Sequence, residues 1–486
     1  MPEGRQPIEA WFDSGDIPTG SEFAKAIAQG VARSSLLVIL TDAYASREWC
    51  REEILLAKEH QRPVVVIDAL DGCETRSFPY LGNVPRIRWS GDPQQGIDLL
   101  LKETLRHLHD TALLNACKLN GDLVFARSPE LATLVGLAPG TTILYPDPPV
   151  GHGEGKRLDK TGVVFTTPLQ RVASERSLAK MPIVLSMSES TDIVRRGMDP
   201  LHLDGCMLDI SRHLLLKGAT LAYGGHLGAE GYTQRLFELV RTHNDLEGVA
   251  PFERIVNHRG WPLPRLSVAE RAKLNAVCKT TLLPRPADVD ETLHPDFVKE
   301  PGFFAAELSP LHRYAWARGM TEMRAYQADR ARSGVAARIV IGGSFGPTVK
   351  VGEDGTRQEK WYASRIPGVL EEVLLSLQQG QPVFLVGAFG GVAALVIDLL
   401  RGIDRPEATW DYQQRAPHAP AMRALYEQRG PAWIDYPEIV AQLRARGPQG
   451  INPLLSDAEQ QELFDAVHPA RITELILRGL GRLNRV

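Results

Sequence analysis

Hydrophobic and polar positions divide the chain into short apolar runs separated by longer amphipathic stretches. Leu36–Leu40 and Pro63–Ala69 are apolar at almost every position and rich in Val, Ile and Leu. The stretches beside them, Glu22–Ala32 and Arg47–His60, repeat apolar residues at the spacing of a helix. Apolar strands that alternate with amphipathic helices are typical of a parallel sheet covered by helices on both faces. The pattern therefore predicts an α/β fold.

The first region, residues 1–110, follows this alternation throughout. Its expected strands are Ile8–Phe12, Leu36–Leu40, Pro63–Ala69 and Val84–Trp89, and its expected helices are Glu22–Ala32, Arg47–His60 and Gly96–Leu108. Residues 111–180 contain more Pro and Gly, which favour turns over regular elements. We expect this second region to be a loop-rich connector with one strand, at Val163–Thr166.

Residues 181–402 repeat the α/β alternation and predict a second, Rossmann-like doubly wound domain. Its expected strands are Pro182–Met187, Ala219–Tyr223, Arg254–Asn257, Ala337–Ile341 and Pro382–Val386, with expected helices at Ser267–Val277 and Ser309–Ala331. Residues 403–486 are expected to form a helical tail, with helices at Tyr436–Arg446, Asp457–Val467 and Pro469–Leu480.

Composition fits a protein of two or three domains that works in a reducing compartment. A chain of 486 residues is too long for a single hydrophobic core. Its five cysteines are widely spaced and form no C-x-x-C pair, which favours the cytoplasm and argues against a zinc site or a disulfide framework. The net charge of −4 provides no basic surplus for nonspecific nucleic-acid binding.

The hydropathy pattern also argues against a membrane segment. The start of the chain lacks the basic and apolar regions of a secretory signal. The most apolar run, Pro382–Ile397, is shorter than a membrane span and contains three glycines. We therefore expect a cytoplasmic protein with neither a membrane nor a nucleic acid as partner.

One acidic residue, Glu53, falls where a helix should be apolar. If Ser46 caps the helix that follows it, 3.6 residues per turn place Glu53 in the apolar arc beside Trp49 and Cys50. Glu52 then faces solvent. Because a half-buried carboxylate is costly unless something compensates it, Glu53 is a candidate for chemistry.

A second feature lies at the end of the first expected strand. The acidic, glycine-bearing loop Asp13–Gly20 follows Trp11 and Phe12. Ligands of parallel sheets gather at the carboxyl ends of the strands. The loop is therefore expected to close over Glu53.

These residues resemble TIR domains. The patterns W-F-D-x-G-D-I-x-x-G, S-x-x-W-C-x-x-E-I and P-V-V-V-I occur in the family's order and spacing, over residues 8 to about 110. The resemblance implies a flavodoxin-like parallel sheet that begins at the family's second strand, without its first strand and helix. It also implies that NAD+ is the substrate, cleaved at the nicotinamide–ribose bond without a cofactor or metal. It makes Glu53 catalytic and assigns substrate binding to Trp11, Phe12, Asp13, Gly20, Ser46, Trp49 and Cys50.

A structural role for Glu53 is the alternative. The carboxylate can bond a backbone amide or pair with Arg33, and many TIR domains are adaptors without catalysis. In that case the chain is a signalling scaffold.

Three glycine-rich turns follow expected strands in the second α/β region. They contain Gly224, Gly225, His226, Gly228 and Gly231; then Gly342 and Gly343; and then Gly387, Gly390 and Gly391. Glycines let a backbone approach a phosphate, and helix N-termini attract anions. Three such turns on one sheet would direct their amides into one crevice. Glycines that only permit close helix–sheet packing are the structural alternative.

This region, residues 181–401, resembles the SLOG superfamily, relatives of the lonely-guy phosphoribohydrolases. Gly342, Gly343 and Glu371 look like that family's P-G-G-x-G-T-x-x-E motif, opened by an insertion, and Arg365 looks like its nucleotide-binding arginine. The resemblance implies a nucleotide sensor at the glycine turns, with His226, Glu371 and Glu372 orienting a ribose or solvent. Hydrolysis of nucleoside monophosphates is an alternative activity.

Together the two resemblances imply a TIR–SLOG protein of bacterial immune signalling or antiphage defence. Its expected partners are NAD+, a nucleotide-derived second messenger similar to ADP-ribose, and other copies of itself in a homo-oligomer. Ligand binding to the SLOG domain would then bias the assembly of TIR domains.

Overall fold

The computed structural model describes residues 23–72, 80–82, 84–150, 152–174, 178–190, 192–224, 235–240, 254–262, 278–293, 309–351, 357–431 and 433–483. The chain divides into two compact units, Met1–Arg171 and Val172–Val486. The expected strand at Ile8–Phe12 and helix at Ser267–Val277 lie outside the described residues.

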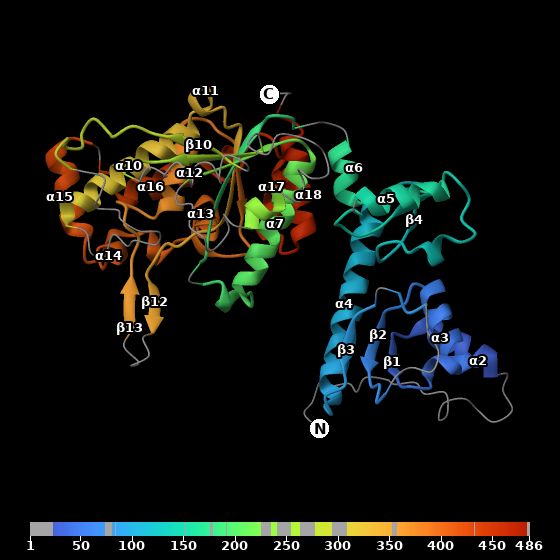
Figure 1. Ribbon diagram of the computed structural model, residues 1–486. Helices are drawn as coiled ribbons and strands as arrows, with labels where there is room; N and C mark the ends of the chain where they lie inside the picture. The colour runs from blue at the N-terminus through green and yellow to red at the C-terminus, as the bar shows by residue number, and fades with distance from the viewer. Residues whose placement is uncertain are drawn as a thin grey trace. The chain divides into compact units, whose positions relative to one another are not determined.

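The first unit contains the α/β region that the hydrophobic pattern predicts. A three-stranded parallel sheet has the order β1-β2-β3, formed by Leu36–Leu40, Val64–Asp68 and Arg86–Arg88. The helices are α2 (Phe23–Arg33), α3 (Glu48–Glu59) and α4 (Pro93–Cys117) (Figure 1). These elements confirm the expected order of strands and helices.

Alternate residues of β2 face different helices, as a sheet covered on both faces requires. Val64 and Val66 share a core with Ile27 of α2 and Ile54 of α3. Ile67 points the other way, where its side chain lies against Gly96 of α4.

The start of α3 differs from the prediction. Ser46 belongs to a separate turn of 3-10 helix, η1 (Tyr44–Ser46), and its hydroxyl donates to the carbonyl of Ala43 at 2.7 Å. The N-cap of α3 is Arg47, which makes no side-chain cap. The predicted cap was wrong because the local turn uses the serine hydroxyl itself.

Residues 111–171 contain more regular structure than the loop-rich connector with one strand that the sequence predicts. Helix α4 continues to Cys117, beyond its predicted end. A second parallel sheet follows, with β4 (Leu123–Val124), β5 (Thr142–Leu144) and β6 (Val164–Thr166), and with short helices at α5 (His152–Leu158) and α6 (Pro168–Ser174). The Lys58 ammonium pairs with Glu130 at 2.6 Å, and the Gln61 amide donates to the carbonyl of Val124 at 3.2 Å. Polar contacts therefore join this segment to α3 and the turn that follows it.

The second unit contains a six-stranded parallel sheet of order β10-β9-β8-β7-β11-β14. Its strands are β7 (Pro182–Ser188), β8 (Thr220–Gly224), β9 (Ile255–Arg259), β10 (Lys279–Leu282), β11 (Ala337–Gly342) and β14 (Val383–Val386). Successive strands run outward from β7 in one direction and then from β11 in the other. The order therefore reverses between β7 and β11, which makes this the expected ligand crevice of a doubly wound sheet.

The helices of this unit are α7 (Pro200–Leu216), α10 (Pro310–Ala328), α11 (Arg330–Ser333), α12 (Gly368–Gln378) and α13 (Gly391–Leu400). An antiparallel hairpin, β12 (Thr348–Val351) and β13 (Arg357–Lys360), forms the insertion after β11 and projects from the unit in Figure 1. In the described part of the chain no helix is long and apolar enough to cross a membrane.

The expected division at residue 402 does not correspond to a boundary in the structure. The later helices are α14 (Trp410–Gln413), α15 (Ala419–Arg429), α16 (Tyr436–Arg446), α17 (Asp457–Asp465) and α18 (Pro469–Leu480). Tyr436, Leu443 and Phe464 are buried in the same core as Val373 of α12 and Leu395 of α13. The predicted tail therefore completes the core of the second unit.

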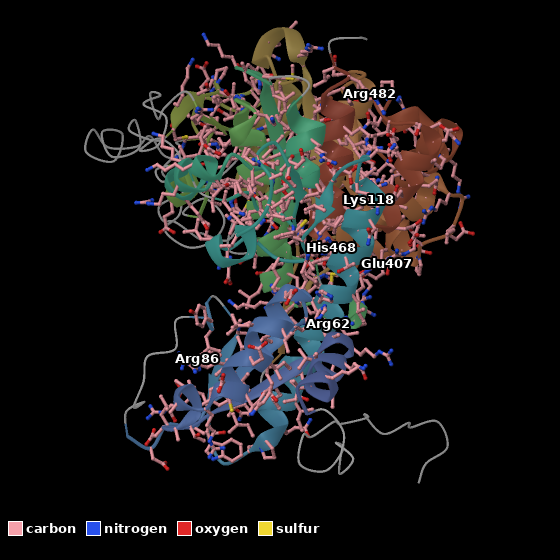
Figure 2. All side chains as sticks on the ribbon, turned by 90° about the vertical axis from the view of Figure 1, so that its right-hand side faces the viewer. Arg62, Arg86, Lys118, Glu407, His468 and Arg482 are labelled. Carbon is pink, nitrogen blue, oxygen red and sulfur yellow. The ribbon has the colours of Figure 1, made fainter. Side chains whose placement is uncertain are left out.

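An ion pair holds the last part of this unit in place. The Arg482 guanidinium, labelled in Figure 2, donates to both carboxylate oxygens of Glu459, at 2.6 and 2.9 Å. A bidentate pair of this kind fixes orientation as well as distance. It ties the end of α18 to the first turn of α17.

Candidate functional site

Glu53 lies on α3 in the position that the helical pattern predicts. Its side chain is half-buried, whereas the neighbouring Glu52 is exposed. Ile54 and Ala57, on the same side of the helix, are fully buried in the core. Glu53 thus lies at the edge of the core, where a carboxylate meets both protein and solvent.

The surroundings of Glu53 differ from the prediction in two residues. Trp49, one turn before Glu53, is 43% exposed, so its indole is less buried than the apolar arc of the helix predicts. Tyr44 of η1 is buried instead, and its hydroxyl donates to the carbonyl of Cys50 at 3.2 Å. Helical periodicity could not reveal Tyr44, because the residue lies on a separate turn before α3.

The pKa of Tyr44 depends on Cys50 and Glu53, the two residues of the TIR motif that follow it. Burial raises the pKa of the Tyr44 phenol well above its ordinary value, and the nearby charges of Cys50 and Glu53 raise it further. The phenol therefore keeps its proton at neutral pH, and it donates that proton to the carbonyl of Cys50. Glu53, Cys50 and Tyr44 form one cluster at the start of α3.

The remaining residues of the predicted NAD+ site divide into two groups. Ser46 is exposed on η1, one turn before Cys50. Trp11, Phe12, Asp13 and Gly20 lie outside the described residues.

In the second unit, the structure brings two of the three glycine turns together at the switch point. Gly343 donates its amide to the carbonyl of Ser188 at 2.9 Å and accepts from the amide of Val392 at 2.8 Å. A Cβ on Gly391 would lie 2.3 Å from the carbonyl oxygen of Gly343. Gly342, Gly343, Gly390 and Gly391 all have positive φ, which favours glycine. These turns pack against each other and against the end of β7.

An acidic side chain already occupies the N-terminus of α13. The amide of Gly391 donates to the Asp192 carboxylate at 2.8 Å, and Arg196 pairs with the same carboxylate at 3.1 Å. A carboxylate there satisfies the positive end of the helix, which an anionic ligand would otherwise do. Burial and pairing of Asp192 favour a structural role for this turn.

Two other glycines make room for helices. A Cβ on Gly224 would lie 2.6 Å from Cε of Met323 in α10, and a Cβ on Gly387 would lie 2.3 Å from the carbonyl oxygen of Phe464. Gly225, His226, Gly228 and Gly231, the rest of the first turn, lie outside the described residues.

Arg365 and Glu371, which the motif comparison relates to one site, do contact each other. The Arg365 Nε donates to Glu371 at 2.8 Å, and Arg324 donates to the other carboxylate oxygen at 2.6 Å. Thr321 adds a hydrogen bond at 2.9 Å. Burial alone would raise the pKa of Glu371, but the charges of Arg324 and Arg365 hold the pKa below its ordinary value.

Glu372 belongs to the same buried network. Its carboxylate accepts from Arg338 at 2.8 Å and lies 3.5 Å from Arg324. Arg338 is fully buried on β11, where burial lowers the pKa of its guanidinium. With three arginines and two glutamates, this network carries a positive surplus inside the domain.

Comparisons with known proteins agree with this architecture. The family model described as SLOG cluster2 matches residues 177–463, and the TIR domain model matches residues 4–101. No curated protein matches the chain. The chain therefore belongs to the SLOG cluster2 family and carries a TIR domain before its SLOG domain.

Proposed function

We propose that the TIR domain cleaves NAD+ at the bond between nicotinamide and ribose, and that a nucleotide bound by the SLOG domain controls this cleavage. The observation that carries the proposal is the half-buried Glu53 on α3, beside Cys50 and the buried Tyr44. Its position in a matched TIR domain supports a catalytic role.

The chemistry suits a single carboxylate. Departure of neutral nicotinamide breaks the C1′–N bond and leaves an oxocarbenium-like ribosyl cation, as in glycoside cleavage. A carboxylate facing the ribose stabilises that charge most strongly in the transition state. Water then adds to C1′ and loses a proton, which gives ADP-ribose; attack by another oxygen or nitrogen of the substrate gives a cyclic product.

Control by the SLOG domain would act through assembly. A nucleotide that binds the assembled form more tightly shifts the population toward it. TIR domains that meet in a homo-oligomer would then complete each other's NAD+ sites. The family match and the positive charge buried in the SLOG domain support this part of the proposal.

NAD+ turnover by the full chain, measured against protein concentration, tests catalysis and assembly together. Glu53→Gln should reduce turnover by at least about a hundredfold, since it removes the charge but keeps the shape. Glu52→Gln is the matched control, because this adjacent carboxylate is exposed, and it should leave turnover unchanged.

Equal turnover by the wild type and Glu53→Gln would rule out the catalytic assignment. Absence of turnover at every protein concentration would favour the alternative, a non-catalytic TIR scaffold. Hydrolysis of nucleoside monophosphates by the SLOG domain has less support, because Glu371 is 1% exposed and its carboxylate is held by two arginines. Adenine release from AMP would detect that activity.

A further inference from the structure

Helix α4 of the TIR domain carries a regular row of exposed side chains. Leu101, Leu105 and Leu108 are 40%, 67% and 58% exposed, and the exposed Ala112 and Asn115 continue the line toward the end of the helix. We call these five residues the α4 row. They follow one another at intervals of four, three, four and three residues, which is the seven-residue repeat of a two-stranded coiled coil. Single exposed leucines are ordinary, but a continuous row of them marks a contact surface.

The opposite side of α4 is packed on the sheet of the same domain. Gly96 lies against Ile67 of β2. At about 100° per residue, Leu105 lies about 180° from Gly96 around the helix axis. Between these two sides, the Thr104 hydroxyl is hydrogen-bonded to that of Ser35, just before β1, at 2.8 Å. These contacts fix the rotation of α4, so that the α4 row faces away from the sheet.

The narrowness of the α4 row determines what kind of surface fits it. A helix that packs on a globular core has an apolar arc of about 100° or more, whereas a narrow seam with a seven-residue repeat fits a second helix with the same repeat. The charged and exposed side chains of Lys102 and Arg106 border the row. A second copy of the chain provides a helix with the matching repeat, because it brings another α4.

Side-chain sizes favour an antiparallel pair of α4 helices. If the twofold axis passes between Leu105 and Leu108, each of these leucines faces the other residue of the second copy. Leu101 then faces Ala112, so a large side chain lies opposite a small one at both ends of the seam. A parallel pair would instead place Ala112 opposite Ala112 and leave a gap in the seam.

Charge favours the same direction. The exposed Asp98 extends the α4 row toward the start of the helix, and in a parallel pair the two copies of this carboxylate would repel each other. In the antiparallel pair, Asp98 lies about 4.5 Å along the axis from Lys118 of the second copy, within reach of a lysine side chain. Lys118 is the exposed C-cap residue of α4 and is labelled in Figure 2. The antiparallel pair also places the positive start of each helix beside the negative end of the other.

We propose that the outer face of α4 is a self-association surface, on which α4 of a second copy of the chain packs antiparallel through Leu101, Leu105 and Leu108. The surface lies on the same domain as Glu53, so this pairing brings two candidate NAD+ sites into one assembly. The link to NAD+ cleavage rests on the proposed function. Self-association rests on the α4 face alone.

Sedimentation equilibrium of the full chain over a range of protein concentrations tests the surface. The wild type should self-associate. Leu105→Glu should weaken the association by at least about tenfold, because each dimer would bury two carboxylates in its seam. The matched control is Leu131→Glu on η2 (Leu131–Leu134), since Leu131 is 60% exposed in the same unit, and this variant should associate like the wild type.

Exchanging the two charges tests the direction of pairing. Asp98→Lys and Lys118→Glu should each weaken the association by about threefold or more, because twofold symmetry removes two ion pairs from each dimer. The two substitutions together should restore wild-type association. If the double variant associates no better than the single ones, the antiparallel pair is wrong.

Thermal unfolding of the dilute, monomeric chain identifies other occupants of the α4 row. Leu105→Glu should leave the melting temperature unchanged, because the side chain is exposed in the monomer. A clear fall would mean that another part of the same chain covers the row, and the inference would be overturned. A wild type that stays monomeric at every concentration would overturn it as well.

NAD+ turnover, measured in parallel, separates the surface from the proposed function. If the wild type pairs through α4 but does not consume NAD+, the surface stands and the proposed catalysis is wrong. If Leu105→Glu is monomeric and consumes NAD+ as fast as the wild type, the surface stands and control through assembly is wrong.

Discussion

Single residues of similar chemistry have very different surroundings in this protein. Glu53 and Glu52 are neighbours on α3, yet one is half-buried and the other exposed. Glu371 and Glu427 also differ: Glu371 is buried and held by two arginines, and Glu427 is exposed with one. The first contrast follows from helical periodicity alone. The second depends on which side chains other elements bring near.

At this scale, we predict that Glu371→Gln strongly destabilises the SLOG domain. The substitution leaves Arg324 and Arg365 without the carboxylate that they share, and breaking a buried ion pair costs about 3–5 kcal/mol. Chemical denaturation monitored by tryptophan fluorescence would measure the loss. Glu427→Gln serves as the control, because Glu427 is 58% exposed in its pair with Arg423, and it should change stability by less than about 0.5 kcal/mol. Similar losses for the two variants would contradict the network.

At the scale of elements, the glycine turns after β11 and β14 act as packing devices. Each turn carries residues with positive φ, and the amide of Val392 joins the two turns by donating to the carbonyl of Gly343. The sequence alone leaves two roles open for such turns, phosphate binding and close packing. In the structure, the Asp192 carboxylate accepts a hydrogen bond from the amide of Gly391, and Phe464 packs against Gly387. These contacts favour packing for the turn at Gly387–Gly391.

We therefore predict that Gly391→Ala lowers the free energy of unfolding by about 3 kcal/mol, more than φ strain alone explains. Its new Cβ would lie 2.3 Å from the carbonyl oxygen of Gly343, so the backbone must shift. Gly430→Ala isolates the φ effect, because Gly430 has a φ of 95° and no atom within 4 Å of the added Cβ. That control should lose only about 1 kcal/mol. Equal losses of stability in Gly391→Ala and Gly430→Ala would mean that close packing between the two turns does not matter.

At the scale of the whole molecule, two histidines whose pKa is lowered make stability depend on pH. Burial, assisted by the charge of Arg338, lowers the pKa of His258 to about 4, and the pKa of His418 is also about 4. In the unfolded chain both histidines titrate near pH 6.5. Between these values the unfolded chain binds protons that the folded chain does not. Stability is therefore complete above pH 6.5 and falls as the pH falls toward 4.

The melting temperature should consequently fall when the pH is lowered from 7.5 to 5, a range in which most carboxylates are still ionised. Each histidine accounts for about 2 kcal/mol of lost stability at pH 5, from the difference between its folded and unfolded pKa values. His258→Gln, which can still bond Gln327, should reduce this pH dependence. An unchanged slope in that variant would show that His258 is not buried as a neutral group.

Much of the fold was predictable because it follows from local patterns. The runs of Val, Ile and Leu predicted β1, β2 and β3 of the first unit and every strand of the six-stranded sheet except β10. The amphipathic stretches predicted α2, α3 and α10. The start of α3, the length of α4 and the status of residues 403–486 were not predictable. A cap depends on one hydroxyl, and the role of a terminal helix depends on the surface that it covers.

The sequence by itself determined the α/β class, the TIR and SLOG domains, and Glu53 as an acid on the core side of a helix. These conclusions need only periodicity, motif spacing and the chemistry of residue types. Tertiary structure alone decided that the buried Tyr44 bonds the carbonyl of Cys50, that Asp192 accepts from the amide of Gly391, and that Arg338 is fully buried against Glu372. The physical reason is that the burial and the electrostatic surroundings of a side chain depend on the residues packed around it. Those neighbouring residues come from helices and strands that are far apart in the sequence.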